Sequence, residues 1–398
     1  MTSDDNSTTK GTKQESGNTE EKASKDFSRR RFLYSAATLT AASIVGCKEE
    51  KSARADRWAK KNPSAGKTPA IGEKEVQSPE TLLAQGSKKG KKSKSSKKSS
   101  RRGHVWRAQN SKAWDNKKQP AQKPIEKMLD DLIKELTGKS KPADAWATLF
   151  KSTDIVALKP NTLGRDWISP SPALVETIIA KLGLIGITAD RILTWDRSHF
   201  ASTDLYKTLK KGPIQVKLQD DWGFEANKRN LATAGKVRLT KAITKATAVI
   251  NIPVCKDHGT AGVTGALKNM SHGSIQNPWD HHSNGCNPSI PEIYDLSHIK
   301  DKVRLVITDG FRMVYDGGPS GMRSRRYNIS HSSLYLSTDP VAMDRVLWHE
   351  IDRVRKNKGK QPLMKRGSKS SGRPIHVLHA DKIGLGESTY SSIKYKKV

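Results

Sequence analysis

Apolar and polar positions from about residue 121 onward follow two alternating patterns. Short apolar runs predict buried strands over 154–159, 191–195, 214–218, 248–252, 303–308 and 332–336. Apolar residues at three- and four-residue spacing predict amphipathic helices over 125–136, 172–182, 205–209, 240–246, 290–299 and 340–355. Two of these helices begin at a recognisable signal, Ser171 followed by Pro172 and Asp339 followed by Pro340.

The alternation of strands and helices predicts the fold class. Short apolar strands separated by amphipathic helices are typical of a mostly parallel sheet that helices cover on both faces. We therefore predict one α/β domain over residues 121–398, with an inserted subdomain between Ser271 and Pro288. A disordered amino-terminal tail is expected to precede it.

The first 46 residues resemble an export signal. Residues 28–33 read SRRRFL, which fits the twin-arginine pattern with Arg29 and Arg30 as its arginines. A short, weakly apolar region follows, and the sequence IVGC that ends it resembles a lipobox in which Cys47 would carry the lipid. We expect the twin-arginine machinery to deliver the chain to the periplasm or cell envelope, anchored to the membrane by lipid. Two alternatives stay open: an unlipidated periplasmic protein, and a basic patch beside a buried helix.

Residues 47–120 are rich in Lys, Ser, Gly, Pro and Ala and contain few large apolar residues. Such a segment cannot bury enough surface to offset the entropy of the chain, so it is predicted to be a disordered linker. Residues 88–102 hold nine basic residues and no acidic one. This run is either a solvated part of the linker or a segment that adheres to anionic lipid or polymer.

The formal net charge of +32 narrows the class of partner. A basic protein favours acidic partners such as anionic lipid, an acidic envelope polymer or a small phosphorylated or carboxylated molecule. Nucleic acid is not expected, because the export signal removes the chain from it. Three cysteines are too few for a disulfide scaffold, and no apolar run is long enough to span a bilayer.

Reactive side chains follow several of the predicted strands. In an open parallel sheet, ligands bind at the carboxyl ends of the strands. The residues that this rule places together are Lys159, Asn161, Asp196, Ser198, His199, Cys255, Lys256, His258 and Asp309. Polar residues are common in any loop, but cations, carboxylates and imidazoles together favour one shared pocket.

Four stretches resemble the family catalogued as domain of unknown function 362. They are ALKPN (157–161), VCKDHGTAGVTGALKN (254–269), DGGPSG (316–321) and STDPVAMD (337–344), and the resemblance extends over about 154–386. The family pattern of Lys-x-His, then Thr, then Lys-Asn is filled by Lys256, His258, Thr264, Lys268 and Asn269. Some members are joined to iron–sulfur ferredoxin modules, whereas this chain has no such cysteine-rich run. The resemblance implies an α/β fold and brings no reaction with it.

Three interpretations of residues 249–273 compete. In the first, Lys159, Lys256 and Lys268 surround the anionic group of a small ligand or redox cofactor, and nearby glycines let backbone amides approach it. The twin-arginine route, which carries folded proteins, is consistent with a cofactor. In this interpretation Asn161, Asp196 and Asn269 also contact the ligand, and His258 and Asp309 serve as acid–base groups.

In the second interpretation, a transition metal or an iron–sulfur centre is bound, because thiolate and imidazole suit such metals. The candidates are Cys255, His258, His272, His281, His282 and Cys286, with Cys255, His258, His282 and Cys286 as the favoured ligands. A disulfide between Cys255 and Cys286 in the oxidising envelope, or two unlinked thiols, are the alternatives. In the third, the segment is structural, and basic loops such as residues 353–373 bind an acidic polymer or lipid without catalysis. We favour an envelope protein that binds a small anionic ligand or redox cofactor with help from a metal. Whether it also transforms the ligand stays open.

Overall fold

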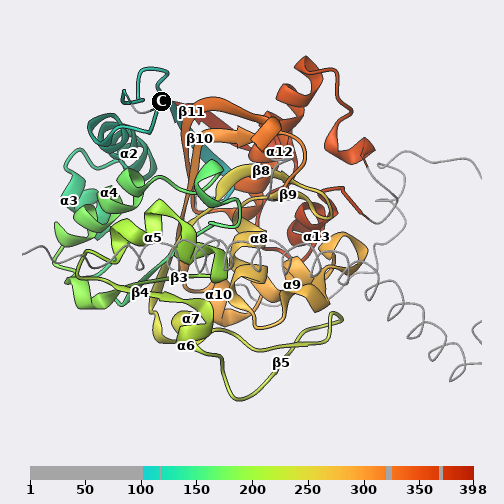
Figure 1. Cartoon of the computed structure of the whole chain (residues 1–398), viewed down its shortest axis with the longest axis horizontal. Helices are drawn as coiled ribbons and strands as arrows, with labels where there is room; N and C mark the ends of the chain where they lie inside the picture. The colour runs from blue at the N-terminus through green and yellow to red at the C-terminus, as the bar shows by residue number, and fades with distance from the viewer. Residues whose placement is uncertain (1–101, 117, 320–324, 367–370) are drawn as a thin grey trace, which may run out of the picture. The chain divides into compact units, whose positions relative to one another are not determined.

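A ten-stranded sheet forms the centre of the chain (Figure 1). The structure is a computed structural model that describes residues 102–116, 118–319, 325–366 and 371–398, all within one compact unit, residues 94–398. The predicted export signal, Cys47 and most of the predicted linker lie outside the described residues. The strands of the sheet are β1 (His104–Gln109), β2 (Val156–Pro160), β3 (Ile192–Asp196), β4 (Gln215–Leu218), β7 (Ala248–Ile252), β8 (Val254–His258), β9 (Gly262–Thr264), β10 (Val303–Val314), β11 (Asn328–Ser337) and β12 (Lys394–Lys397).

Most neighbouring strands of this sheet are parallel. Eight strands follow the order β12-β1-β11-β10-β7-β2-β3-β4, and β8 pairs with β10 and β9 beside this path. Strand β11 is antiparallel to both of its neighbours, and β9 is antiparallel to β8. Two short strands, β5 (Arg229–Asn230) and β6 (Lys236–Val237), form a separate hairpin. The predicted mostly parallel α/β sheet is therefore confirmed.

Helices cover both faces of the sheet, and each face has its own apolar core (Figure 1). One core takes its helical residues from α2 (Gln122–Thr137), α3 (Pro142–Ala147), α4 (Pro172–Gly183) and α5 (Asp204–Leu209). The other takes them from α7 (Lys241–Lys245), α8 (Ala266–Ser271), α9 (Ser289–Tyr294), α10 (Ser297–Lys300), α12 (Pro340–Asn357) and α13 (Ile375–Lys382). A short helix, α6 (Gln219–Trp222), follows β4 directly.

The alternation of side chains along β2 connects the fold to the site. Val156 and Leu158 belong to the core beneath α2 to α5, whereas Ala157 belongs to the core on the other face. Because side chains alternate along a strand, Lys159 lies on the same face as Ala157. There it meets α8, whose Asn269 contacts its ammonium group.

Two helices begin at the residues that the sequence indicated. The hydroxyl of Ser171 accepts a hydrogen bond from the N–H of Leu174 (3.3 Å), and Pro172 is the first residue of α4. The carboxylate of Asp339 accepts from the N–H groups of Val341 and Ala342 (2.9 and 2.8 Å) at the start of α12. Both starts are satisfied by a side chain, as helix amino termini require.

The carboxyl-terminal boundary of the predicted linker is wrong. Residues 104–109 form β1, which lies between β11 and β12, with Trp106 opposite Leu336. Apolar residues of β1 are buried, but basic and polar neighbours hide the pattern in the sequence. The predicted subdomain is wrong as well, since residues 272–286 form three short 3₁₀ turns, of which the first packs against α8 and the last against α13.

None of the helices in the described ranges is long and apolar enough to cross a membrane.

Candidate functional site

A cavity of about 370 Å³ lies at the carboxyl ends of β2, β3 and β8. This is the edge at which parallel sheets bind their ligands. Residues from these strand ends, from α8 and from the 3₁₀ turns form its walls. They are Lys159, Asn161, Thr162, Leu163, Asp196, Arg197, His199, His258, Thr260, Thr264, Lys268, Asn269, His272, Gly273, Pro278, Trp279, His282 and Pro319.

Strand β8 turns alternate side chains to opposite sides. On the cavity side, Lys256 donates from Nζ to Oδ1 of Asn161 (2.8 Å), and His258 lines the cavity itself. On the other side, Cys255 belongs to the apolar core and Asp257 pairs with Arg366. The period of the strand therefore separates the predicted site residues into two groups.

The ring of His258 is held in one orientation by backbone N–H groups. Thr260 and Ala261 donate to its Nδ1 at 3.0 and 3.1 Å. Since Nδ1 accepts, the proton of the neutral ring is on Nε2. Burial, followed by the nearby charge of Lys268, holds the pKa of His258 well below its usual value, so the ring is neutral at pH 7. His258 thus presents an N–H donor, which does not suit the metal-ligand role that the sequence predicted.

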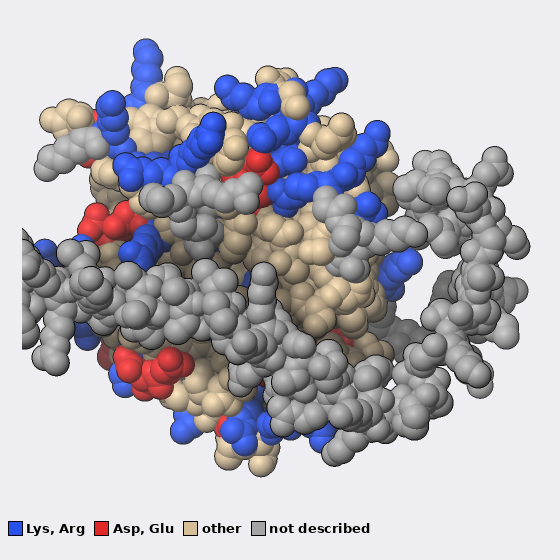
Figure 2. All heavy atoms as spheres, turned by 45° about the vertical axis from the view of Figure 1, so that its right-hand side comes forward, with Lys and Arg blue, Asp and Glu red and all other residues tan. Residues whose placement is uncertain are grey.

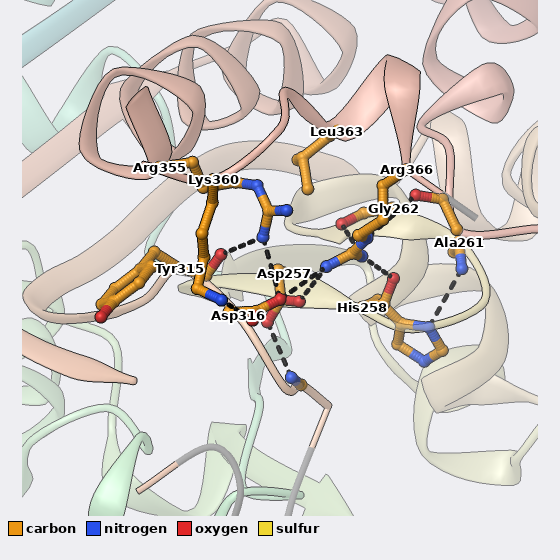
Figure 3. Close-up of polar contacts among 12 residues, drawn as sticks. Asp257, His258, Ala261, Gly262, Tyr315, Asp316, Arg355, Lys360, Leu363 and Arg366 are labelled. Atoms are coloured by element: carbon orange, nitrogen blue, oxygen red, sulfur yellow. Dashed lines mark hydrogen bonds and ion pairs between the residues drawn. The ribbon is translucent and has the colours of Figure 1, made fainter. Parts of the chain in front are cut away.

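Arg366 holds the far side of β8 (Figure 3). Its guanidinium pairs with the carboxylate of Asp257 and donates to the carbonyl of His258 at 2.6 Å. The other oxygen of Asp257 accepts from the N–H of Gly318 (2.8 Å). These contacts fix the backbone from which His258 enters the cavity.

Other cations of the predicted polymer-binding run are also paired inside the protein. Arg355 contacts the carbonyl of Tyr315 and the carboxylate of Asp316 (2.8 and 3.0 Å), and Lys360 reaches the same carboxylate (2.8 Å). These basic side chains neutralise an acidic residue next to β8, which leaves fewer of them to face a polymer.

Lys159 forms a closed ion pair with Asp196. Its buried ammonium lies 2.9 Å from Oδ1 of Asp196 and 2.7 Å from the carbonyl of Pro160. The hydroxyl and the N–H of Thr162 both donate to the other oxygen of Asp196 (2.7 Å). Burial opposes the charge of this carboxylate, but Lys159 and Thr162 outweigh it and hold its pKa below the usual value. The pair is therefore satisfied without a ligand.

Asn269 ties the parts of the site together. Its Nδ2 donates to the carbonyl of Lys159 (2.9 Å) and to Oδ1 of Asn251 (2.8 Å), and its Oδ1 accepts from the ammonium of Lys159 (3.3 Å). These bonds join α8 to β2 and β7. The side chain thus positions Lys159 and the start of the cavity wall.

Lys256 and Lys268 differ from Lys159 in their partners. In the described ranges no carboxylate oxygen lies within 4.0 Å of either ammonium nitrogen. Lys256 contacts Asn161, and Nζ of Lys268 lies 3.3 Å from Nε2 of His282. Burial lowers the pKa of Lys256 to about 7 and that of Lys268 to about 8. Both groups thus titrate near neutral pH, and neither has a direct carboxylate partner in the described residues.

Thr264 supplies a hydroxyl without a partner. The residue is 3% exposed and lines the cavity, and its Oγ1 makes no hydrogen bond within the described part of the chain. A buried polar group left unsatisfied costs about 1–3 kcal/mol. A ligand oxygen in the cavity would remove this cost.

His272, His282 and Cys286 meet at one side of the cavity. One donor atom of each lies within 4.8 Å of the others. All three were candidates in the sequence, but Cys255 and His258 were favoured over His272 as partners of His282 and Cys286, and the structure brings His272 in their place. Burial lowers the pKa of His282 to about 4 and that of His272 well below its usual value, so both rings are neutral at pH 7.

The alternative of a disulfide between Cys255 and Cys286 is wrong for this structure. Both thiols are free and buried. Cys255 faces the core on the side of β8 that is turned away from the cavity, near Arg107 and Glu350. Cys286 lies instead at the end of the 3₁₀ turns, near Lys268.

Asp309 does not line the cavity. Its carboxylate accepts from the N–H groups of Ser171 (2.8 Å) and Phe311 (3.0 Å), so it holds the loop before α4 against β10. The predicted acid–base role therefore does not fit its position. Strand β10 continues to Val314, so Asp309 lies within the strand and not at its carboxyl end, where the sequence had placed it.

Several residues of the cavity were missing from the sequence prediction. Arg197 directly follows Asp196, and its position after β3 is a signal that the strand-end rule could have used. Trp279 is 75% exposed, lines the cavity and stacks on His282 with 5.2 Å between ring centroids. The available signal in the sequence was a tryptophan close to two histidines in a polar segment.

A larger hollow, of about 1080 Å³, lies elsewhere on the surface beside α7. Its charged residues include Glu225 and Arg229, which pair with each other. Among the described residues that line this hollow, none has a buried polar atom without a hydrogen-bond partner, whereas Thr264 in the smaller cavity does. The smaller cavity is therefore the better candidate.

The fold and the cavity define an α/β protein with a cavity at the ends of parallel strands, lined in part by cationic side chains. Residues 156–349 match the family described as domain of unknown function (DUF362), which confirms the family that the motifs indicated. The match is shorter at its carboxyl end than the resemblance seen in the sequence.

No curated protein matches the chain. Among solved structures, the lactate racemase apoprotein from Thermoanaerobacterium thermosaccharolyticum is similar, with 14% sequence identity and a TM-score of 0.36. The similarity covers 53% of this chain and 52% of that chain, so the match spans about half the length of the solved protein.

Proposed function

We propose that the cavity binds a small molecule through an anionic group, a phosphate or a carboxylate. The observation that carries this proposal is Lys268, which is buried, lines the cavity and has no carboxylate partner in the described residues. An unpaired buried ion costs several kcal/mol relative to water. An anion in the cavity would offset that cost, as Asp196 does for Lys159.

Neighbouring groups support the same ligand. Arg197 lines the cavity and adds a permanent positive charge, while Thr264 and the Nε2–H of His258 are neutral donors. Hydrogen bonds from such donors to an ionised oxygen are stronger than bonds between neutral groups. Together they would hold an oxyanion without any movement of the backbone.

The donors also suit a transformation of the ligand. A neutral imidazole N–H and an ammonium group, both fixed and shielded from water, stabilise negative charge that develops on an oxygen. His258 would act as the donor and Lys268 as the charge. This enzymatic role is part of the proposal, and it requires that the cavity binds an anionic ligand.

The cellular setting is a further part of the proposal. The SRRRFL and IVGC sequences support export by the twin-arginine machinery and a lipid anchor at Cys47. The protein would then work in the periplasm or cell envelope, attached to the membrane, on a small anionic ligand present there.

Calorimetric titration of the full chain with inorganic phosphate and with malonate tests the ligand. We expect one of the two anions to bind once per chain, and Lys268→Met to weaken it about ten- to hundredfold. Lys211→Met is the matched control, because Lys211 is exposed and does not line the cavity. Absence of binding for both anions, or equal loss in the two variants, would overturn the proposal.

A second candidate function is adhesion to acidic polymer or lipid through the basic surface. It is supported by the charge of +32 and by Lys and Arg side chains that gather on the upper part of one face (Figure 2). Binding to anionic vesicles that disappears at high salt and is unchanged by Lys268→Met would favour this candidate.

A further inference from the structure

Three side chains with metal-binding atoms converge on one wall of the cavity. His272 and His282 come from the start and the middle of the 3₁₀ turns, and Cys286 ends them. One nitrogen of each ring and the sulfur of Cys286 lie within 4.8 Å of one another. Ligands on a tetrahedral ion, bonded at about 2.0–2.3 Å, are separated by about 3.3–3.8 Å, so the three atoms would approach one another by about 1 Å when an ion binds.

Backbone carbonyls fix both imidazoles from behind. Nδ1 of His282 lies 2.7 Å from the carbonyl oxygen of Pro278, and Nε2 of His272 lies 3.0 Å from that of His281. A carbonyl can only accept, so each of these nitrogens carries the proton. The second nitrogen of each ring carries a lone pair: Nδ1 of His272 lies 3.3 Å from the hydroxyl of Ser271, and Nε2 of His282 lies near the ammonium of Lys268. A carbonyl behind each ring is the arrangement that orients histidines in metal sites.

We propose that His272, His282 and Cys286 bind one divalent transition metal ion. A thiolate with two imidazoles suits a borderline ion of the zinc class and leaves a fourth position open. Binding replaces the thiol proton of Cys286, so one proton is released for each ion bound. Because His272 and His282 line the cavity, the open position faces the space assigned to the anion.

Lys268 connects the metal to the anion, and this step rests on the proposed function. Its ammonium lies 3.3 Å from Nε2 of His282, the nitrogen that is free to bind the ion. The ion must therefore displace it, and the two positive charges repel each other. An anion between them removes the repulsion, so phosphate should strengthen metal binding, and the metal should strengthen phosphate binding equally.

Titration with cobalt(II), which gives a visible absorption that zinc lacks, tests the site. The full chain is stripped with chelator under reducing conditions and carries Cys47→Ser, so that only the two buried thiols remain. We expect one ion per chain and an absorption from thiolate-to-cobalt charge transfer. Cys286→Ser should abolish that absorption, and His282→Gln should weaken binding about ten- to hundredfold.

Cys255→Ser is the matched control, since Cys255 is an equally buried thiol on the other side of β8. It should leave the absorption unchanged. Loss of the absorption in Cys255→Ser, its survival in Cys286→Ser, or no stoichiometric binding would overturn the proposal. Thermal melting shows whether each variant is folded. If Cys286→Ser does not fold, the effect of His282→Gln on cobalt binding decides the test.

Cobalt titrations with and without phosphate distinguish a failure of the metal site from a failure of the proposed anion site. Cobalt binding that depends on Cys286 but does not respond to phosphate keeps the metal site and refutes the coupling. Phosphate binding that depends on Lys268 without any cobalt binding keeps the proposed function and refutes the metal site. In Lys268→Met, cobalt should bind more tightly and phosphate should no longer affect it.

Discussion

At the scale of single residues, removing the hydroxyl of Thr264 should affect ligand affinity and folding stability differently. It is buried at the cavity wall and makes no hydrogen bond to any described residue. Thr264→Val keeps the shape and removes the unsatisfied group, so the free energy of unfolding should stay equal or rise by about 1 kcal/mol. Phosphate affinity should fall, because the ligand loses a donor. Denaturant unfolding and calorimetry measure the two effects, and a lower stability with unchanged affinity would contradict a ligand role.

Lys256 should make stability depend on pH. Burial lowers its pKa to about 7 in the folded chain, whereas an unfolded chain holds the same proton up to about 10.4. Between these values the unfolded state binds more protons, so this residue makes the free energy of unfolding rise with pH. Lys256→Met should remove that part of the slope, as unfolding in urea at pH 7 to 10 would show. Parallel curves for the wild type and Lys256→Met would refute the lowered pKa, and Lys211→Met should change nothing.

The sequence brought most of the lysines to the right place but could not separate their roles. Strand ends predicted Lys159, Lys256 and Asp196 near one another, because parallel strands end at one edge. The sequence does not show that Asp196 pairs with Lys159 and leaves Lys268 unpaired. These residues are far apart in the chain, and their distances are set only by the folded structure. For the same reason His272 was a candidate for the metal site but not one of the favoured ligands: its position beside Cys286 follows from the 3₁₀ turns and not from sequence spacing.

At the scale of elements, α8 depends on close contact with α12. A Cβ atom at Gly265 would lie 2.1 Å from Oδ1 of Asp344, the carboxylate that accepts from the first N–H groups of α8. Gly265→Ala should therefore lower the free energy of unfolding by about 1–3 kcal/mol and displace Lys268. Gly183→Ala in α4 is the control, since a Cβ there meets nothing within 4 Å. Equal thermal midpoints for the two variants would contradict the contact.

The pattern of apolar residues predicted the elements best where their partners are close in the chain. Buried strands such as β2, β3 and β7 are continuous apolar runs, and α12 has both a cap and a regular spacing. Strand β1 was missed because its partner β11 lies more than two hundred residues away and its own neighbours are basic. Only the pairing makes HVWRAQ a strand, and pairing is not visible in one sequence.

At the scale of the whole molecule, the proposed export signal would decide in which compartment the protein works. Replacing Arg29 and Arg30 by lysine should keep the full chain in the cytoplasm, because the export pattern specifies both arginines. Arg31→Lys, at the unspecified position of the pattern, should still be exported. Cell fractionation and immunoblotting measure the outcome. Periplasmic protein from the double variant would contradict export by this route.

The most direct test of the cavity as an anion site is a crystal structure of the full chain soaked in selenate. Selenate is a tetrahedral oxyanion, and selenium can be located by its anomalous scattering. We predict one selenate in the cavity, with oxygens within hydrogen-bond distance of Nζ of Lys268 and Oγ1 of Thr264. Selenate bound only at exposed lysines, with the cavity free of it, would contradict the proposed function.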